Sequence, residues 1–365
     1  MEAETAEACR RVPPSPIITV GILSMKRERM QWMDFFRGFC ILLVIMMHST
    51  AAMQERVSIQ APEWVQVFNL AMEPFRMTSL MFLSGMLLGK SFGKDTRSYI
   101  SGKLSLIFWP YVIWSFPILY YMGILNLEYI LKIPVSAPTL LWYLWFLFAY
   151  YMLALVIRRL GIPVLAVAVV SLVASMFLPD FLRMSRFAYL FFFFLVGHYY
   201  MENRHRLPVP APLAWLCLGL AAVGSYLNVH GVVIRYHAQQ AWVPLALIAW
   251  IVWAAQYYTR AIPKGVSQPL EWVGRNSLVF YVSHFPIQCA VVLAMVRHGE
   301  QSPGLLYAAA VGSSLLAAIL IQFARERSLF VAGLFDFRKM AAFWQGLRPG
   351  RRGDAIPVAG KQDGS

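Results

Sequence analysis

Three ionisable residues, Asp34, Arg37 and His48, occur in an otherwise apolar stretch of the chain, DFFRGFCILLVIMMHST. Arg37 and His48 are eleven positions apart, and eleven helical steps of 100° end about 20° past three full turns. Both side chains are therefore expected on one helix face, about 16 Å apart along the axis. An ionised side chain within a membrane-spanning helix costs about 3 kcal/mol on insertion scales, so such a row indicates a functional site.

The residue types suggest two different chemical roles within this row. Arg37 could hold an anionic group such as a phosphate, because a guanidinium offers a planar fork of donors. His48 could accept a proton from an attacking hydroxyl, because imidazole ordinarily titrates near neutrality. The alternative is an arginine that snorkels at one membrane edge and a histidine at the other. The row alone leaves both interpretations open.

A second charged pair, Glu73 and Arg76, lies three positions apart in NLAMEPFRMTSLMFLSGML. The two side chains could pair across one helical turn, although Pro74 between them could distort that turn. A charged pair beside an apolar run is expected to point towards protein or water rather than lipid. The alternative is an ion pair at the outer edge of a span.

A polar stripe is expected in the segment VGRNSLVFYVSHFPIQ. Ser277, Tyr281, His284 and Gln288 follow offsets of four, three and four, which places them within about 60° on a helical wheel. Such a stripe lines a cavity or a seam between helices, and His284 could orient a substrate or the first histidine. The alternative is hydrogen bonding between helices for packing alone, worth about 0.6 kcal/mol per bond.

A fourth candidate is the aromatic run TLLWYLWFLFAYYM, which contains Trp142, Trp145 and three tyrosines. These rings could form a wall that stacks on a sugar, with Trp145 as a substrate-binding residue. Trp and Tyr also gather at membrane interfaces as belts. The sequence leaves these two interpretations open.

The composition predicts an all-α, polytopic transmembrane helix bundle. The chain of 365 residues is 59% hydrophobic and only 14% charged, whereas a soluble domain has about 25% charged residues. It is long enough for about ten spans of about 20 residues each. We expect these spans near 35–53, 64–89, 104–125, 139–157, 161–178, 185–201, 211–229, 239–258, 277–297 and 303–323.

The net charge of +14 reflects topology rather than binding of nucleic acid. Of the Lys and Arg residues, 25 fall in one alternating set of connections and termini and six in the other, which is the positive-inside pattern. It predicts cytoplasmic termini and an even number of spans in a multi-pass protein of the cell (inner or plasma) membrane. We expect a flexible segment over 1–30, a membrane domain over 31–325 and a basic, largely disordered tail over 326–365.

Several motifs that would indicate other chemistry do not occur in the sequence. There is no Walker motif, no GxSxG elbow, no HExxH and no Gly-rich dinucleotide loop. The four cysteines include no CxxC spacing. ATP-driven coupling, soluble-type hydrolase chemistry and a metal cofactor are therefore not expected.

Taken in order, four segments resemble the acyltransferase type 3 family of integral membrane O-acyltransferases. MDFFRGFCILLVIMMHS is similar to its first-span pattern of Asp, Arg-Gly, an apolar run and His. PFRMTSLMFLSGMLLGK resembles its second-span pattern, LWYLWFLF its Leu-Trp-Phe-Leu segment, and VGRNSLVFYVSHFPI its late Tyr-x-x-His-x-Pro segment. The resemblance covers about residues 35–290.

The resemblance implies transfer of an acyl group, usually acetyl or succinyl, from acyl-CoA to a hydroxyl of a cell-surface carbohydrate or glycolipid. It implies acyl-CoA as co-substrate, no metal, and membrane lipid as surroundings, as in O-acetylation of a polysaccharide. Carried onto this chain, it gives His48 the role of general base, with Arg37 and Asp34 positioning the donor or stabilising charge. Arg76, Glu73, Ser277, Tyr281, His284 and Trp145 are then expected to bind substrate.

Two departures from the family pattern stand out. An Arg-rich motif often follows the second span in the family, whereas this connection has scattered Lys90, Lys94, Arg97 and Lys103. The appended extracellular hydrolase-like domain of many members is also missing from this sequence. The alternative function is a transporter or flippase of a glycolipid or acylated carrier, which would use the same polar faces as a translocation path.

Overall fold

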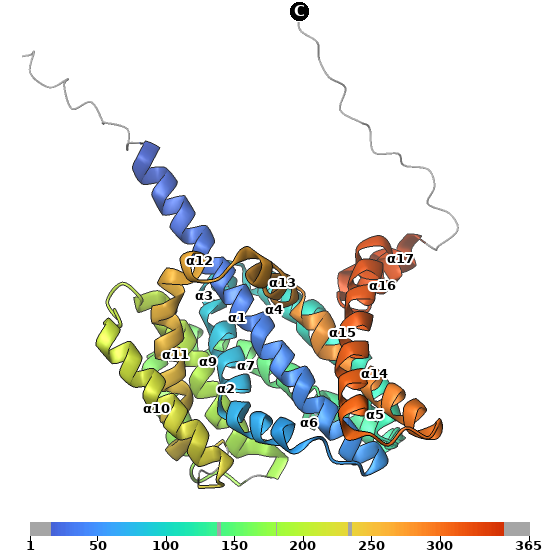
Figure 1. The fold of residues 1–365 in the computed structure, drawn as a ribbon. Coiled ribbons are helices and arrows are strands. Elements are labelled where there is room, and N and C mark those ends of the chain that lie inside the picture. Colours follow the sequence, from blue (N-terminus) through green and yellow to red (C-terminus); the bar gives the residue numbers. More distant parts are fainter. Residues whose placement is uncertain (1–15, 137–139, 180, 233–235, 347–365) are drawn as a thin grey trace, which may run out of the picture.

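The protein folds as a bundle of helices wrapped around a long first helix (Figure 1). The computed structural model describes residues 16–136, 140–179, 181–232 and 236–346, and this part of the chain contains no β-strand. The predicted all-α class is therefore confirmed. Helices suit a chain in lipid because each satisfies its own backbone hydrogen bonds.

The helices follow one another along the chain with short connections. The α-helices are α1 (Pro16–Val57), α2 (Glu63–Met86), α3 (Leu88–Phe92), α4 (Thr96–Lys103), α5 (Trp109–Tyr121), α6 (Leu127–Ser136), α7 (Trp142–Arg159), α8 (Val164–Ala174), α9 (Met184–Asn203), α10 (Ala211–Val229), α11 (Trp242–Ala254), α12 (Tyr258–Ala261), α13 (Lys264–Arg275), α14 (Ser277–Arg297), α15 (Pro303–Arg327), α16 (Leu329–Gly333) and α17 (Phe337–Gly346). A π-helical turn, η1 (Leu104–Phe108), joins α4 to α5, and short 3₁₀ turns are η2 (Phe181–Arg183), η3 (Ala238–Gln240) and η4 (Ala255–Tyr257).

Within the described residues, six helical segments are long and apolar enough to cross a membrane. They are Gln31–Val57, Thr96–Tyr121, Ala211–Val229, Ala238–Tyr257, Ser277–Arg297 and Pro303–Arg327, and the protein is accordingly a multi-pass membrane protein. The predicted spans near 64–89, 139–157, 161–178 and 185–201 coincide with α2, α7, α8 and α9. These four helices do not reach the length and hydropathy that the six segments have for crossing a membrane. The ten-span count and the cytoplasmic termini therefore stay predictions.

Glycine permits two very close helix crossings in the interior. A Cβ on Gly85 of α2 would lie 1.8 Å from the carbonyl oxygen of Phe194 in α9, and one on Gly197 of α9 would lie 2.1 Å from that of Phe82. A Cβ on Gly274 of α13 would likewise lie 1.8 Å from the carbonyl oxygen of Asp34 in α1. Small residues allow backbones in a membrane to approach in this way, and the second crossing holds the turn of α1 at Asp34 against α13.

Basic residues gather at one end of the bundle, which we call the basic end. Figure 1 shows α3, α4, α12, α13, α16 and α17 at this upper end. Hydrogen bonds from Arg158 to the Phe92 carbonyl oxygen and from Arg159 to Thr96 join the end of α7 to α3 and α4. The basic end carries Lys90, Lys94, Arg97, Arg158, Arg159, Lys264, Arg275, Arg325, Arg327, Arg338 and Lys339.

The stretch after the last long helix corrects one prediction. Residues 326–346 were expected in a disordered tail, but they complete α15 and form α16 and α17; residues 347–365 lie outside the described residues. Asp336 accepts hydrogen bonds from the Ser105 hydroxyl in η1 and from the backbone N–H of Arg338. Trp109 Nε1 also donates to the carbonyl oxygen of Gly333, at 2.8 Å. These long-range bonds order the segment.

At the other end of the sequence, α1 begins at Pro16, inside the segment predicted to be flexible, and residues 1–15 lie outside the described part.

Replacing Asp336 by Ala is expected to release α17 without unfolding the bundle. Burial raises the pKa of Asp336, but the hydrogen bonds from Ser105 and Arg338 outweigh it and hold the pKa below its ordinary value. Stabilisation by this carboxylate is therefore complete at neutral pH and is lost as the pH falls through the lowered pKa. We expect a cost of about 1–2 kcal/mol in local stability, measured as faster hydrogen exchange in Phe337–Gly346 at pH 7. Equal exchange in both proteins would contradict this role.

Replacing Gly85 by Val is expected to destabilise the whole bundle, because the added side chain would clash with the backbone of α9. Overpacking of this kind costs about 1–3 kcal/mol or more. The matched control is Gly312→Val in α15, where an added Cβ meets nothing within 4 Å. The melting temperature in detergent should fall for the first variant alone, and a similar fall in both would show that the crossing is not the cause.

Candidate active site

The two histidines singled out in the sequence meet in the interior of the bundle. His48 Nδ1 of α1 lies 2.7 Å from His284 Nε2 of α14. The rings are nearly parallel, with an interplanar angle of 15° and centroids 4.9 Å apart. His48 is 6% exposed and His284 is 2% exposed. The row on α1 and the stripe on α14 therefore converge at one buried pair.

The surrounding backbone determines which nitrogen of each ring carries hydrogen. His284 Nδ1 lies 3.1 Å from the carbonyl oxygen of Phe280, and a carbonyl oxygen only accepts, so this nitrogen carries the hydrogen. In a neutral imidazole the other nitrogen is then an acceptor. His48 Nδ1 consequently donates to His284 Nε2, which leaves His48 Nε2 with a free lone pair. This is the tautomer that a general base requires.

Gln288 stabilises the contact between α1 and α14 one turn further along α14. Its Nε2 donates to the carbonyl oxygen of Ile45 at 3.0 Å and to the hydroxyl of Ser49 at 2.8 Å. Ser49 follows His48 directly in α1, so the amide fixes the backbone that carries the histidine. Tyr281, one turn before His284, donates to the carbonyl oxygen of Leu140. The polar stripe predicted for α14 thus faces protein along this part of its length.

Arg37 and Asp34 lie at the basic end rather than beside the histidines. Arg37 Nη1 is 3.4 Å from Asp34 Oδ1, and the two side chains are 18% and 22% exposed. At Gly274, α13 packs closely against this turn of α1. On α13, the buried Glu271 accepts from the hydroxyl of Tyr258 and pairs with Arg275 at 3.3 Å. The first row of residues therefore marks two separate places, a charged cluster and a buried histidine.

Arg76 sits at a kink that Pro74 makes in α2. Proline has no N–H, so the carbonyl oxygen of Leu70 four residues earlier loses its helical partner, and Asn228 of α10 donates to it at 2.7 Å. Arg76 Nη1 donates to the carbonyl oxygen of Asn69 at 3.1 Å. Arg76 is only 5% exposed. It thus holds the kinked backbone from inside the bundle.

Glu73 belongs to the same kink but faces α10. Its Oε2 lies 3.3 Å from Asn228 Nδ2, and Gln240 donates to Asn228 Oδ1 at 3.1 Å. These bonds place Glu73 in a network of amide side chains between α2, α10 and η3. Helix α2 runs without a break from Glu63 to Met86, and the outer-edge position of the Glu73 and Arg76 pair stays a prediction.

A row of tyrosines begins at the basic end. The Lys103 ammonium lies 3.3 Å from the ring centroid of Tyr151 and donates to the hydroxyl of Ser91. Tyr99 donates to the carbonyl oxygen of Tyr151 at 2.8 Å. Tyr151 in turn donates to the carbonyl oxygen of Ser84 at 3.2 Å. Helices α4, α7 and α2 are joined by these bonds.

The row continues from Ser84 to the histidines. Ser84 Oγ is 3.1 Å from the hydroxyl of Tyr143. The Tyr143 ring packs edge-on against Tyr281 with centroids 5.4 Å apart, and the Tyr281 ring lies 6.0 Å from that of His284. We call this set, Tyr99, Tyr151, Ser84, Tyr143 and Tyr281, the tyrosine seam. It connects the basic end with the histidine pair through buried polar groups.

Two predicted substrate-binding residues lie elsewhere. Trp145 donates to the carbonyl oxygen of Pro134 at 3.1 Å and packs on Phe187, contacts that involve α6 and α9 rather than the histidines. Ser277 is the first residue of α14, two turns before His284 and so about 10 Å from it along the axis. The structure therefore does not bring Trp145 or Ser277 to the histidine pair, and their roles stay predictions.

The tyrosines of the aromatic run were also open to interpretation as an interfacial belt. Tyr143, Tyr150 and Tyr151 are 7%, 0% and 5% exposed, so that interpretation does not hold for them. The sequence does not predict the tyrosine seam. A buried tyrosine cannot be told apart from any other buried aromatic residue until the partner of its hydroxyl is known. Lys103 and Tyr99 were missed for the same reason, since their partners lie on other helices.

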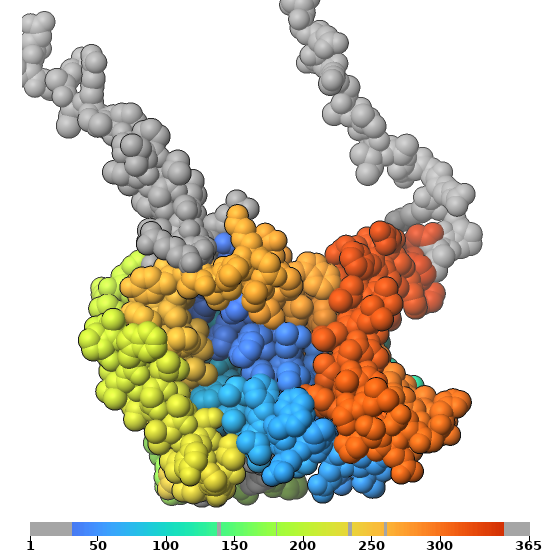
Figure 2. Space-filling view, in the orientation of Figure 1, coloured from blue at the N-terminus to red at the C-terminus, as the bar shows by residue number. Residues whose placement is uncertain are grey.

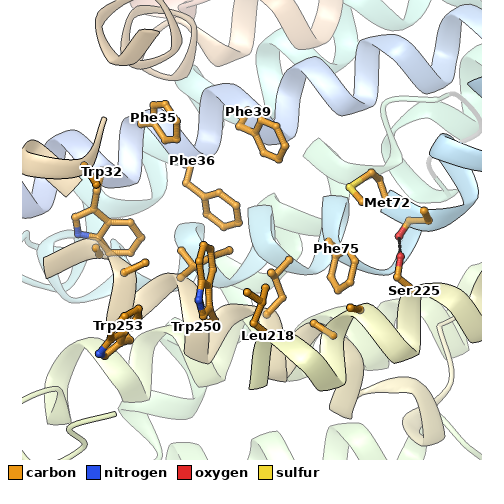
Figure 3. Close-up of a pocket in the computed structure, with 18 of the residues that line it drawn as sticks. Trp32, Phe35, Phe36, Phe39, Met72, Phe75, Leu218, Ser225, Trp250 and Trp253 are labelled. Carbon is orange, nitrogen blue, oxygen red and sulfur yellow. Dashed lines mark hydrogen bonds between the residues drawn. The ribbon is translucent and has the colours of Figure 1, made fainter. Parts of the chain in front are cut away.

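A large apolar groove of about 1250 Å³ lies between α1, α2, α10 and α11. Figure 3 shows Trp32 and Phe36 of α1 facing Trp250 of α11 across it. In Figure 2 the hollow lies between the yellow to orange helices α10 and α11 and the blue helix α1. Neither histidine of the pair lines the groove. His230 is the one histidine in a lining that is otherwise mainly aliphatic and aromatic, so the surface suits hydrocarbon.

Among the residues that the structure describes, no group of three or more His, Cys, Asp or Glu side chains could hold a metal ion.

Comparisons with known proteins agree with this architecture. The family model described as an acyltransferase domain matches residues 30–323. The chain is 25% identical over 184 residues to the inner membrane protein YcfT of Escherichia coli (strain K12), which covers 42% of this chain and 51% of the relative. The chain thus spans about half the length of the curated relative it matches. No solved structure matches it.

The matched region begins just before Asp34 and continues through α14. It therefore includes the charged turn of α1, the tyrosine seam and the histidine pair. This extent covers most of the chain, and it coincides with the bundle of apolar helices. The chain belongs to the acyltransferase 3 family of membrane proteins.

Proposed function

We propose that the protein transfers an acyl group, acetyl or succinyl, from acyl-CoA to a hydroxyl of a cell-surface carbohydrate or glycolipid in the bacterial inner membrane. One observation carries this proposal. The carbonyl oxygen of Phe280, His284 and His48 form a chain of hydrogen bonds that leaves His48 Nε2 as a base within a buried site. A base of this kind is what activation of a hydroxyl requires.

The proposed reaction is a direct transfer. His48 Nε2 takes the proton of the acceptor hydroxyl as its oxygen attacks the thioester carbonyl carbon. The carbon–sulfur bond then breaks, and the proton on His48 passes to the departing thiolate, which leaves as free CoA. His284 Nε2 accepts from His48 Nδ1 throughout, so it keeps the ring oriented and supports the positive imidazolium. The arrangement corresponds to the orienting partner of a catalytic triad.

The two ends of the bundle suggest where each substrate enters. Arg37 and the basic end suit the phosphates of the donor, which is expected on the cytoplasmic side. The tyrosine seam runs from there to the histidines and offers hydroxyl groups to a long polar arm. His48 lies further along α1, so an acceptor from the other side could reach it. This arrangement supports transfer across the membrane between substrates from opposite sides.

Replacing His48 by Ala is expected to lower acyl transfer by about 10²–10⁴-fold, the usual contribution of a general base. The measurement is release of free CoA by purified protein in the presence of acceptor. His298→Ala is the matched control, because His298 is an exposed histidine at the end of α14 and should leave the rate unchanged. Undiminished CoA release by a folded His48→Ala protein would refute the assignment. Movement of unmodified substrate across vesicles would favour the transporter.

Replacing His284 should affect turnover more than donor binding, because His284 acts through His48. His284→Leu removes the acceptor for His48 Nδ1, and we expect kcat to fall by about 10–100-fold, as for other partners that orient a histidine. His284→Gln keeps an acceptor oxygen and should retain more activity. The KM for acyl-CoA should change little in both. Equal loss in the two variants, or a change in KM alone, would argue against an orienting role.

A further inference from the structure

The chemistry proposed for the histidine pair makes no use of the apolar groove between α1, α2, α10 and α11. The groove has a volume of about 1250 Å³, which exceeds the range of about 300–1,000 Å³ that is usual for small-molecule sites. Among the described residues, no Lys, Arg, Asp or Glu lines it. Its walls include the rings of Trp32, Phe36, Trp250 and Trp253 (Figure 3). The groove therefore suits a large ligand that is hydrocarbon along most of its length.

The groove extends further along the helices than one leaflet of a membrane. Trp253 of α11 lines it, and its ring centroid lies 5.7 Å from that of Trp215 in α10. His230 lines the groove where α10 ends, fifteen positions after Trp215. Fifteen helical positions measure about 22 Å, whereas half of a hydrocarbon core of about 30 Å is about 15 Å. A chain that fills the groove is therefore longer than a leaflet is thick.

Contacts between the helices keep the groove open. The hydroxyl of Ser225 in α10 donates to the carbonyl oxygen of Ala71 in α2 at 2.7 Å. Gly224 packs so closely on α11 that an added Cβ would lie 2.4 Å from a methyl carbon of Val243. Closing the groove against α1 would break these contacts of α10 with α2 and α11. The space therefore belongs to the fold, as is usual for a ligand site.

Polar side chains line the two ends of the groove. At the end of α10, the rings of Tyr226 and His230 lie 4.3 Å apart between centroids, and both side chains are exposed. At the basic end the lining residues are Tyr257 and Tyr258, and the Tyr258 hydroxyl donates to Glu271 at 2.9 Å. Because the basic end is predicted to be cytoplasmic, the Tyr226 and His230 end is the one that an acceptor from the other side meets.

We infer that the apolar groove binds the hydrocarbon chain of a lipid-linked acceptor, a saccharide carried on a polyprenyl phosphate. The chain lies along α10 and α11, and its phosphate lies at the exposed Tyr226 and His230, which can both donate to it. A polyprenyl chain matches the length of the groove, whereas a phospholipid acyl chain covers a single leaflet. The inference rests on the proposed function and narrows its acceptor to a glycolipid.

The lipid chain and the base occupy different faces of α1. Phe39 lines the groove, and His48 is nine positions later. Nine helical positions are about 14 Å along the axis and end about half a turn round the helix. His48 therefore lies beyond Phe39 in the direction away from the basic end. The saccharide extends from the phosphate towards His48, while the chain stays in the groove and anchors it.

Photo-cross-linking tests the binding directly. The probe is a polyprenyl phosphate with a diazirine in its chain, added to purified protein in phospholipid nanodiscs. We expect labelling of peptides from α10 and α11, and excess unlabelled polyprenyl phosphate should lower it at least about tenfold. An equal reduction by added phospholipid would assign the groove to bulk lipid and overturn the inference. Cross-links that join two copies of the chain through α10 would instead make the groove a protein interface and also overturn it.

A matched pair of variants tests the groove in the reaction. Ala222 is exposed and lines the groove, so Ala222→Trp fills it without overpacking the core. Val223 is 53% exposed and does not line it, so Val223→Trp is the control. We expect at least about a tenfold loss of labelling and a similar rise in KM for the polyprenyl-linked saccharide, for Ala222→Trp alone. The KM for the same saccharide on a short alkyl chain should stay unchanged. The same effect in both variants, or in neither, would overturn the inference.

The two proposals can fail separately. If the wild type accepts polyprenyl-linked and short-chain saccharides with equal KM and the probe does not label the groove, the inference is wrong and the proposed function stands. If the wild type releases no CoA from acyl-CoA with any of these acceptors, the proposed function is wrong and the assignment of the chain to an acceptor falls with it. The melting temperature of each variant checks its folding.

Discussion

The hydrogen bond between His48 Nδ1 and His284 Nε2 joins the first helix of the chain to one 236 residues later. One turn further along α14, Gln288 donates to Ile45 and Ser49 of α1 and holds the two helices in register. One turn earlier, Tyr281 donates to Leu140, just before α7. Each of these bonds pairs a polar group that would otherwise have no hydrogen-bond partner in a low-dielectric interior. The constraint that buried polar groups need partners thus fixes how α1 and α14 meet, and this in turn orients the His48 ring.

The same constraint explains the kink in α2. Pro74 frees the carbonyl oxygen of Leu70, and a neighbouring helix supplies Asn228 to satisfy it. Arg76 satisfies the carbonyl oxygen of Asn69 from within the same helix. A proline in a membrane helix is tolerated when neighbours replace the lost bond in this way. Because Arg76 is held there, a permanent positive charge is kept at the kink inside the bundle, in a position that packing defines.

Polar and apolar functions occupy different faces of α1. The face with Trp32 and Phe36 borders the wide apolar groove, whereas the face with His48 meets α14 and its polar stripe. The tyrosine seam links the histidine pair to the basic end through buried hydroxyls. A hydrocarbon chain and a polar donor arm would therefore meet separate surfaces of the protein. This separation agrees with the proposed transfer from a charged donor inside a membrane.

Local sequence patterns determined the helical membrane class and the faces that carry polar residues. Hydropathy and the 100° step are properties of neighbouring residues, so the row of Arg37 and His48 and the stripe through His284 could be predicted. Which stripe meets which row depends on contacts between distant helices, at glycines such as Gly85 and Gly274 where backbones almost touch.

Only the tertiary structure therefore brought His48 to His284 and placed Trp145 away from this pair. The structure also shows that Tyr143 and Tyr151 are buried and belong to the tyrosine seam. A hydroxyl or imidazole in the sequence shows its chemistry but not its partner, because the partner is chosen by packing across the bundle.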